Sequence, residues 1–330
     1  MDYKALGRTG VKVSPLCLGC MNFGWGTEED ESIAIIHRAL DAGINFLDTA
    51  DVYGKGASET IVGRALQGKR DGVFLASKVH GRMGDGPNDQ GNSRLHIIQG
   101  CEASLKRLNV DHIDLYQIHR PQASVPIDET LRALDDLVRQ GKVRYIGTST
   151  FGAWQLVESL WASDKLGLNR FVSEQPPYNL LDRRIERELL PMAQTYGFGV
   201  IPWSPLAGGM LTGKYRKGKK GPGGSRYESG KFRSGEAVPA AAWKVIEGVR
   251  ELAAEKSCEM DAFALAWCAA NEAVTSPIIG PRTMEQLEGN LKALEVAVTA
   301  DDRKRVDELI EPGTHAAPYY QADFGPNARW

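Results

Sequence analysis

The sequence predicts an α/β protein built as one (β/α)8 TIM barrel, in which eight parallel strands alternate with helices. Eight short apolar segments alternate with longer segments of helical periodicity, and this alternation is typical of a parallel sheet with crossover helices. The length of 330 residues lies within the range of a single barrel of this kind. No shift in composition marks a boundary, so residues 1–330 are expected to form one domain.

The predicted strands are short, apolar and bounded by glycine, proline or polar residues. They are 15–20, 45–50, 73–79, 113–119, 143–149, 170–175, 199–204 and 276–280. The clearest helical pattern spans 128–141, where Leu131, Leu134 and Leu137 share one face and Gly141 is typical of a helix end. A Rossmann sheet is the rival architecture, but the residues after the first strand, GCMNFGWGTEE, lack the G-x-G-x-x-G spacing.

Three segments lie outside this strand–helix alternation and are expected to be additions to the barrel. Residues 3–13 resemble a β-hairpin around a glycine-rich turn that could close one end of the barrel. Residues 300–310 predict an added helix, followed by an aromatic-rich tail. The segment 206–237 is long, glycine-rich and basic, and it follows the seventh strand on the face where such barrels build their sites. Loops of this length are typical of functional lids or of solvated, mobile segments.

Composition narrows the class of protein. Residues are 42% hydrophobic and 25% charged, and the net charge is −2, so no overall field favours nucleic acid. No apolar run is long enough to cross a bilayer, and the first residues lack a signal-peptide core. We therefore expect a cytoplasmic protein with a small-molecule substrate, without nucleic-acid binding or membrane insertion. The oligomeric state stays open, with a homo-oligomer among the alternatives.

The cysteines and acidic residues give little support to a metal site. The five cysteines are an odd, scattered set, unlike a disulfide framework. Cys17 and Cys20 form a C-x-x-C, which zinc sites and redox pairs also use, but no second ligand pair follows. Their strand-like context favours buried small residues. The stretch FLDTADVYG fails the EF-hand ligand spacing, and no H-E-x-x-H occurs.

Polar residues end three consecutive predicted strands. Asp48 ends the second strand, Lys78 the third and His119 the fourth, while Tyr53 follows Asp48 closely. Side-chain alternation places Asp48, Lys78 and His119 on the faces of their strands that could converge in one barrel mouth. Asp51 is expected to be a loop residue with local hydrogen bonds.

Together these groups suit proton donation to an oxygen that gains negative charge. An ammonium beside a tyrosine lowers the pKa of its hydroxyl, and a carboxylate holds that ammonium charged. A histidine can hydrogen-bond a substrate oxygen. Taken singly, each residue is as readily a helix cap, a solvated cation or a locally satisfied histidine. Their joint placement at consecutive strand ends favours a catalytic site.

The sequence resembles the aldo-keto reductases along nearly its entire length. The stretches that carry the resemblance are NFLDTADVYG, ASKV, IDLYQIHRP, GTSTF, EQPPYN, WSPLAGGMLTGKY and IIGPRTMEQLEGN. The similarity is greatest to bacterial members near the potassium-channel β-subunits. It implies a catalytic tetrad of Asp48, Tyr53, Lys78 and His119, and NADPH-dependent reduction of an aldehyde or ketone, sugars and keto-sugars included. A cofactor-binding regulatory or redox-sensing subunit of a larger complex is the alternative.

The resemblance also implies the residues that hold NADP(H). Those expected at the nicotinamide and the first loop are Gly19, Cys20, Met21, Asp48, Ser149, Thr150, Gln175 and Trp203. Those expected along the phosphates and adenosine are Ser204, Pro205, Leu206, Gly208, Lys214, Arg226, Gly280, Arg282, Gln286 and Asn290. Thr150 stands where many relatives have asparagine. Gly289 stands where glutamate is common, which leaves one adenosine contact open.

The preference for NADPH follows from charge, because a 2′-phosphate requires a nearby guanidinium or ammonium. Arg282, Lys214 and Arg226 are the candidates. The stretch GGMLTGK at 208–214 imitates a phosphate-binding P-loop, but Tyr215 replaces the hydroxyl that would hold magnesium. Substrate identity is not encoded in any motif. Four aromatic residues either line a substrate pocket or pack within loops: Phe23, Trp25, Tyr319 and Tyr320.

Overall fold

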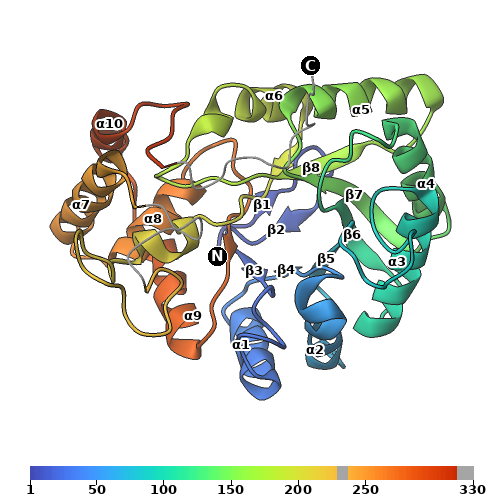
Figure 1. Ribbon diagram of the computed structural model, residues 1–330, viewed down its shortest axis with the longest axis horizontal. Helices are drawn as coiled ribbons and strands as arrows, with labels where there is room; N and C mark the ends of the chain where they lie inside the picture. The colour runs from blue at the N-terminus through green and yellow to red at the C-terminus, as the bar shows by residue number, and fades with distance from the viewer. Residues whose placement is uncertain (229–236, 318–330) are drawn as a thin grey trace.

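The computed structural model describes residues 1–228 and 237–317, and it confirms the predicted barrel (Figure 1). Eight strands form one sheet in the order β10-β3-β4-β5-β6-β7-β8-β9, and every neighbouring pair is parallel. The strands are β3 (Cys17–Gly19), β4 (Phe46–Asp48), β5 (Phe74–Val79), β6 (Ile113–Ile118), β7 (Val143–Ser149), β8 (Phe171–Gln175), β9 (Gly199–Val200) and β10 (Ile278–Ile279).

The first and last strands of this order are joined by backbone hydrogen bonds. Thr275 and Ser276 donate to the carbonyl oxygen of Val200 at 2.8 and 3.3 Å, and Ile278 donates to the carbonyl oxygen of Pro202 at 2.8 Å. These contacts, which we call the β9–β10 seam, close the sheet into a ring. Figure 1 shows this ring with the helices outside it.

Ten α-helices lie in the described part of the chain. They are α1 (Glu29–Asp41), α2 (Ala57–Ala65), α3 (Arg94–Leu108), α4 (Ile127–Arg139), α5 (Ala153–Leu166), α6 (Leu189–Tyr196), α7 (Ala240–Glu255), α8 (Met260–Ala269), α9 (Met284–Leu291) and α10 (Ala300–Leu309). Four 3-10 helices join them: η1 (Tyr53–Gly56), η2 (Arg184–Glu186), η3 (Ala207–Thr212) and η4 (Lys292–Glu295). None of the described helices is long and apolar enough to span a membrane.

The helical patterns of the sequence correspond to packed helices. Leu131, Leu134 and Leu137 of α4 are fully buried, so the predicted apolar face is the one that covers the sheet. The added helix is α10, where Thr299 and Asp302 form a reciprocal capping box. The long segment after β9 contains η3 and is described as far as residue 228. The predicted tail beyond residue 317 lies outside the described residues.

Several strands are shorter than predicted. The segment 199–204 forms a strand only at Gly199–Val200, and 276–280 only at Ile278–Ile279. Proline has no backbone N–H to donate to a ladder, and Pro202 and Pro277 stand beside these two strands. The strand predicted at 15–20 likewise begins at Cys17, after Pro15.

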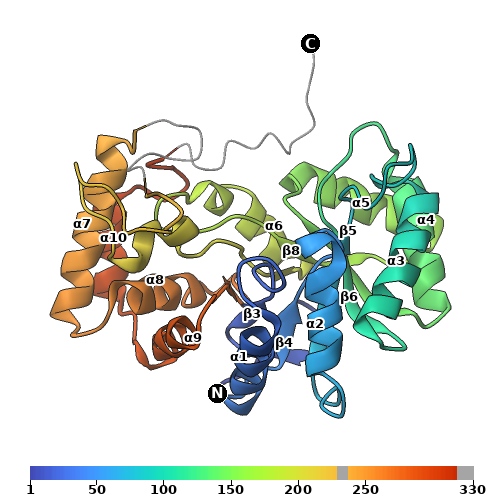
Figure 2. The same cartoon turned by 60° about the horizontal axis from the view of Figure 1, so that its bottom comes forward.

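The predicted N-terminal hairpin forms from β1 (Lys4–Ala5) and β2 (Lys12–Val13), which pair antiparallel. It lies across the centre of the ring in Figure 1, and near the lower end of the molecule, by the N-terminus, in Figure 2. Arg8 donates its backbone N–H to the carbonyl oxygen of Gly197 at 3.0 Å, just before β9 begins. The hairpin therefore closes the barrel at the amino ends of its strands.

Two apolar layers lie on either side of the sheet. The inner layer joins the hairpin's Leu6 and Val13 to inward side chains of the strands, such as Phe46, Phe74 and Leu115. The outer and larger layer fills the space between the strands and the surrounding helices. Because the inner layer occupies the lower part of the ring, polar side chains are placed toward its carboxyl end.

Helices α2 and α3 approach closely at Gly63. A methyl group at this position would lie 2.4 Å from the carbonyl oxygen of Leu108, well inside van der Waals contact. A glycine-to-alanine change in a helix ordinarily stabilises it by up to about 1 kcal/mol. Here the expected outcome is reversed, because α3 or α2 must shift.

We therefore predict that Gly63→Ala lowers the free energy of unfolding in urea by about 1–3 kcal/mol, the usual cost of overpacking. Gly289→Ala is the matched control, since its nearest neighbour would be Asp261 Oδ2 at 3.7 Å, an ordinary contact. That variant should be neutral or slightly more stable. Equal stability of the two variants would show that α2 and α3 are not held at this distance.

Candidate active site

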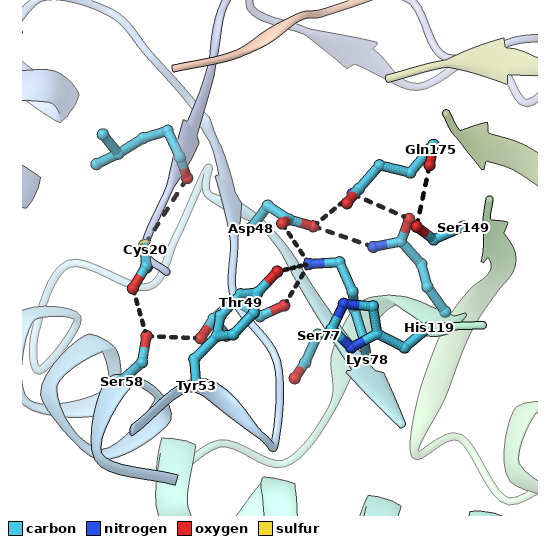
Figure 3. Close-up of polar contacts among 12 residues, drawn as sticks. Cys20, Asp48, Thr49, Tyr53, Ser58, Ser77, Lys78, His119, Ser149 and Gln175 are labelled. Carbon is cyan, nitrogen blue, oxygen red and sulfur yellow. Dashed lines mark hydrogen bonds and ion pairs between the residues drawn. The ribbon is translucent and has the colours of Figure 1, made fainter. Parts of the chain in front are cut away.

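The centre of the barrel mouth is a fully buried lysine. Lys78 lies near the end of β5, and its Nζ forms an ion pair with Asp48. The same nitrogen donates to the carbonyl oxygen of Thr49 at 2.8 Å and lies 3.4 Å from Tyr53 Oη (Figure 3). Burial disfavours the ammonium, but Asp48 and Tyr53 together outweigh it and raise the pKa of Lys78 above its usual value. Lys78 is therefore a cation at neutral pH.

Two amides hold the other oxygen of Asp48. Gln117 in β6 donates its Nε2 group to Asp48 Oδ2 at 3.0 Å. Gln175 in β8 donates its Nε2 group to the same oxygen at 2.9 Å (Figure 3). A buried charge is tolerated when it is paired and hydrogen-bonded, and the Asp48 carboxylate meets both conditions. Gln117 was not predicted as a site residue, although strand alternation places it on the same face as His119.

Tyr53 reaches Lys78 because the chain turns sharply after β4. Asp51 donates its backbone N–H to the carbonyl oxygen of Lys78 at 3.2 Å, and η1 then begins at Tyr53. Lys78 Nζ lies 5.0 Å from the centroid of the Tyr53 ring. Burial raises the pKa of the Tyr53 hydroxyl more than Lys78 lowers it. The sequence predicted that the neighbouring ammonium lowers this pKa, and Lys78 does so, but burial outweighs it and the net shift is upward. Tyr53 therefore carries its proton at neutral pH.

His119 completes the group as a neutral ring. Its backbone N–H donates to the carbonyl oxygen of Val79 at 2.9 Å, directly after β6. The ring packs edge-to-face against Tyr53 with centroids 5.7 Å apart. Burial, together with the positive charges of Lys78 and Arg120, holds the pKa of His119 well below its usual value. The structure thus brings the four predicted residues Asp48, Tyr53, Lys78 and His119 together.

Comparison with known proteins identifies the family of this chain. The sequence profile described as the Aldo/keto reductase family matches residues 15–311. The chain belongs to the aldo/keto reductase family. This agrees with the resemblance inferred from the sequence motifs.

Relatives of this aldo/keto reductase carry several kinds of name. An uncharacterized oxidoreductase, YrpG, of Bacillus subtilis is 41% identical over 324 residues, which cover 95% of this chain and 97% of the relative. A probable voltage-gated potassium channel subunit beta of Oryza sativa is 40% identical over 303 residues, 90% and 92% of the two chains. Versiconal hemiacetal acetate reductase of Aspergillus parasiticus is 33% identical over 343 residues, 94% and 98%.

The residues expected around a nicotinamide lie next to the four residues above. Ser149 at the end of β7 donates its hydroxyl to the carbonyl oxygen of Gln175 at 3.0 Å. Thr150 follows in a left-handed conformation with φ of 64°. Trp203 lies just after β9, and its backbone N–H donates to the carbonyl oxygen of Pro176 at 2.9 Å. These residues occupy the carboxyl ends of β7, β8 and β9.

The loop after Trp203 has an unusual backbone. Ser204, Ala207 and Gly208 all have positive φ, at 54°, 49° and 64°. Pro205 is buried and Leu206 partly buried between them. Beyond this turn comes Lys214, whose pKa is lowered by partial burial and by the charges of Arg282, which follows β10, and of Arg226. The predicted phosphate-binding residues therefore form a positively charged edge.

The segment after β10 packs on the first βα loop. Asn22 Nδ2 donates to the carbonyl oxygen of Gly280 at 3.0 Å, and Thr27 Oγ1 donates to that of Arg282 at 3.0 Å. The Arg282 guanidinium lies 5.9 Å from the centroid of the Trp25 ring. In α9, Gln286 Oε1 accepts the backbone N–H of Arg282 at 2.9 Å.

The remaining predicted cofactor residues differ in exposure. Asn290 is buried in α9, and a side chain at the neighbouring Gly289 would make only an ordinary contact with Asp261. In the first loop, Gly19 and Cys20 are buried, whereas Met21 is partly exposed. Met21 is within reach of a ligand in the mouth.

A cavity of about 370 Å³ lies in front of Tyr53, lined by Met21, Asn22, Trp25, Val52, Tyr53, Gly54 and Arg226. Trp25 thus fits the aromatic-pocket hypothesis. Phe23 is fully buried in the outer core and fits the packing hypothesis instead. Tyr319 and Tyr320 lie outside the described residues.

Asp51 meets only part of its prediction. It lies in the turn after β4, as expected. Its side chain, however, lacks the expected local hydrogen bonds: Asp51 is 1% exposed, and neither carboxyl oxygen has a hydrogen-bond partner among the described residues. Nearby Glu59 is also fully buried, accepts from Ser77 Oγ at 2.5 Å and pairs with Arg107 at 2.7 Å. Burial, together with the charge of Glu59, raises the pKa of Asp51 to about 7.

This raised pKa makes stability depend on pH. In the unfolded chain an aspartate loses its proton near pH ~4, whereas folded Asp51 keeps it until about pH 7. The native state therefore binds an extra proton between these values, and stability falls as pH rises through this window.

We predict that Asp51→Asn, which cannot ionise, becomes more stable relative to the unaltered protein as pH rises. The difference in the free energy of unfolding should grow by roughly 2–4 kcal/mol between about pH 4 and pH 8. Urea unfolding across this range measures it, with exposed Asp71→Asn as the control that stays flat. A flat difference for Asp51→Asn as well would mean that Asp51 ionises normally.

Proposed function

We propose that this protein reduces an aldehyde or ketone to the alcohol with NADPH, and that Tyr53 donates the proton. The observation that carries the proposal is the buried chain Asp48–Lys78–Tyr53 beside a neutral His119. A protonated tyrosine next to a permanent cation is suited to give up its proton to an oxygen that becomes negative.

Each of the four residues has one task in this proposal. When bound, NADPH supplies a hydride to the carbonyl carbon. Tyr53 Oη gives its proton to the carbonyl oxygen, so that the product is a neutral alcohol. Lys78 stabilises the tyrosinate that remains, and Asp48 keeps Lys78 charged and in place. Neutral His119 offers a hydrogen bond to the substrate oxygen.

The chemistry of the surrounding residues suits a dinucleotide. Lys214 lies close enough to Arg226 and Arg282 for their charges to act on it, and a group of cations favours a ligand with phosphate groups. The positive-φ turn at Ser204, Ala207 and Gly208 brings backbone close to the same edge. The three cations support NADPH over NADH, since the extra 2′-phosphate adds two negative charges.

The proton-donor role predicts a specific loss in Tyr53→Phe. With NADPH and a panel of aldehydes, ketones and keto-sugars, kcat should fall on the order of 10²–10⁴-fold, the contribution of general acid catalysis. The dissociation constant of NADPH, measured by fluorescence titration, should change little.

Tyr116→Phe is the matched control for this variant. It removes the same atom from a buried tyrosine of β6 whose hydroxyl has no hydrogen-bond partner in the described structure. Its kcat should stay near that of the unaltered protein. Full activity of Tyr53→Phe would remove Tyr53 from the proposed role.

The phosphate role predicts a change in cofactor preference. Lys214→Met removes a charge-assisted hydrogen bond, worth about 1.5–3 kcal/mol, so the ratio of NADPH to NADH affinity should fall by roughly tenfold or more. Lys217→Met is an exposed control in the same loop and should leave the ratio unchanged. A ratio unaffected by both variants would place the 2′-phosphate elsewhere.

A second candidate function is a cofactor-binding regulatory subunit. It is supported by the relatives from Oryza sativa and Arabidopsis thaliana, each called a probable voltage-gated potassium channel subunit beta and each 40% identical to this chain. Tight NADPH binding without turnover of any compound in the panel would favour it. Turnover that depends on Tyr53 would favour the reductase.

A further inference from the structure

Arg120 is a cation in the barrel mouth to which neither the sequence motifs nor the proposed chemistry assigns a task. It follows His119 after β6 and is partly buried. Its Nη1 lies 2.7 Å from the carbonyl oxygen of His119, 3.1 Å from Thr150 Oγ1 and 3.3 Å from Ser149 Oγ. One guanidinium nitrogen therefore joins the end of β6 to the turn that follows β7.

The same guanidinium also faces the loop after β9. Its central carbon lies 5.8 Å from the centroid of the Trp203 ring, within the range of a cation–π contact. Ser149 and Trp203 come from separate strands, and Arg120 contacts both. A planar guanidinium can stack on a ring and donate in its own plane at once, which an ammonium cannot do.

Arg120 also adds a positive charge to the reaction centre. Its charge lowers the pKa of Tyr53, as that of Lys78 does more strongly, against the effect of burial. It contributes to the low pKa of His119 as well. Conversely, burial lowers the pKa of Arg120 itself, while Tyr53 and Glu174 raise it. The charges of two cations therefore act on the Tyr53 hydroxyl, and Lys78 is the one in contact with it.

We propose that Arg120 is a positioning residue of this active site, which aligns the Ser149–Thr150 turn with the Trp203 ring for the nicotinamide half of the cofactor and supplies the second positive charge beside Tyr53. This inference rests on the proposed function. It assigns Arg120 two separable effects, one through its geometry and one through its charge.

The charged and titratable groups around Arg120 come from several elements. Lys78 and His80 lie at the end of β5, and His119 precedes Arg120 after β6. In β8, the carboxyl group of buried Glu174 accepts a hydrogen bond from the Thr148 hydroxyl at 2.5 Å and another from the backbone N–H of Phe151 at 3.1 Å. Burial raises the pKa of Glu174 to about 7. A pH profile must therefore be compared between variants that all retain Glu174.

Two substitutions separate geometry from charge. Arg120→Met removes the charge and the guanidinium contacts. Arg120→Lys keeps the charge but loses the planar set of guanidinium donors and the stacking on the Trp203 ring. For Arg120→Met, the dissociation constant of NADPH, titrated without substrate, should rise about tenfold, as expected for two or three lost hydrogen bonds. In alcohol oxidation, which needs tyrosinate, the half-maximal pH of kcat should move upward by about 0.5 unit or more, because a cation near Tyr53 is gone.

Arg120→Lys should keep the weakened cofactor binding but return the half-maximal pH toward that of the unaltered protein. Arg170→Met is the matched control. Arg170 also lies over a ring, 5.1 Å from the centroid of Phe198, and donates to backbone carbonyls, but it precedes β8 at the opposite end of the barrel. This control should change stability alone.

The outcomes distinguish this inference from the proposed function. If Arg120→Met leaves the dissociation constant within twofold and the pH midpoint in place, Arg120 is not a positioning residue. If Arg170→Met produces the same two changes, they report general loss of structure, which also overturns the inference. If the unaltered protein turns over no substrate but Arg120→Met still weakens NADPH binding, the proposed reaction fails while the geometric role of Arg120 stands.

Discussion

The buried ion pair between Lys78 and Asp48 is the contact around which the barrel mouth is organised. Two charges removed from water are costly, and their attraction compensates only when the remaining donors and acceptors are also satisfied. Here Thr49, Gln117 and Gln175 supply those partners. The contacts that make the pair tolerable join β4, β5, β6 and β8, so the same bonds define the reaction centre and hold four strands in register. Removing one partner alone would leave an uncompensated charge.

Strand β5 carries buried polar groups on both of its faces. Lys78 points into the barrel toward Asp48, while the preceding Ser77 points outward to Glu59, which pairs with Arg107. Asp51 lies between these two groups. Its backbone N–H donates to the carbonyl oxygen of Lys78, and the charge of Glu59 adds to burial in raising the pKa of its carboxyl group. The turn that places Tyr53 is therefore packed against charge on both sides, and the pKa of the Asp51 carboxyl group is raised to about 7.

The barrel and the four central residues could be predicted because both follow from short-range patterns. Strand alternation alone places Asp48, Lys78 and His119 at one mouth. Burial, by contrast, depends on which helices pack over a segment, and no local pattern encodes it. For this reason the burial of Asp51 and the raised pKa of Tyr53 were missed.

Other residues were missed because their types are ordinary for their positions. Gln117 is a neutral amide within a strand, and Arg120 resembles a solvated cation after one. Only the three-dimensional contacts show their partners. The short lengths of β9 and β10 were readable in principle, since Pro202 and Pro277 lack the N–H that a longer ladder would need.

The β9–β10 seam has a consequence for how the fold and the ligand depend on each other. It is closed by few hydrogen bonds between short strands. The residues proposed to hold the cofactor stand on both sides of it, with Trp203 to Gly208 after β9 and Gly280 to Asn290 after β10. A dinucleotide bound along both segments would add contacts that link the two sides of this seam. Release of the ligand would then loosen the barrel at the same place where it opens the site.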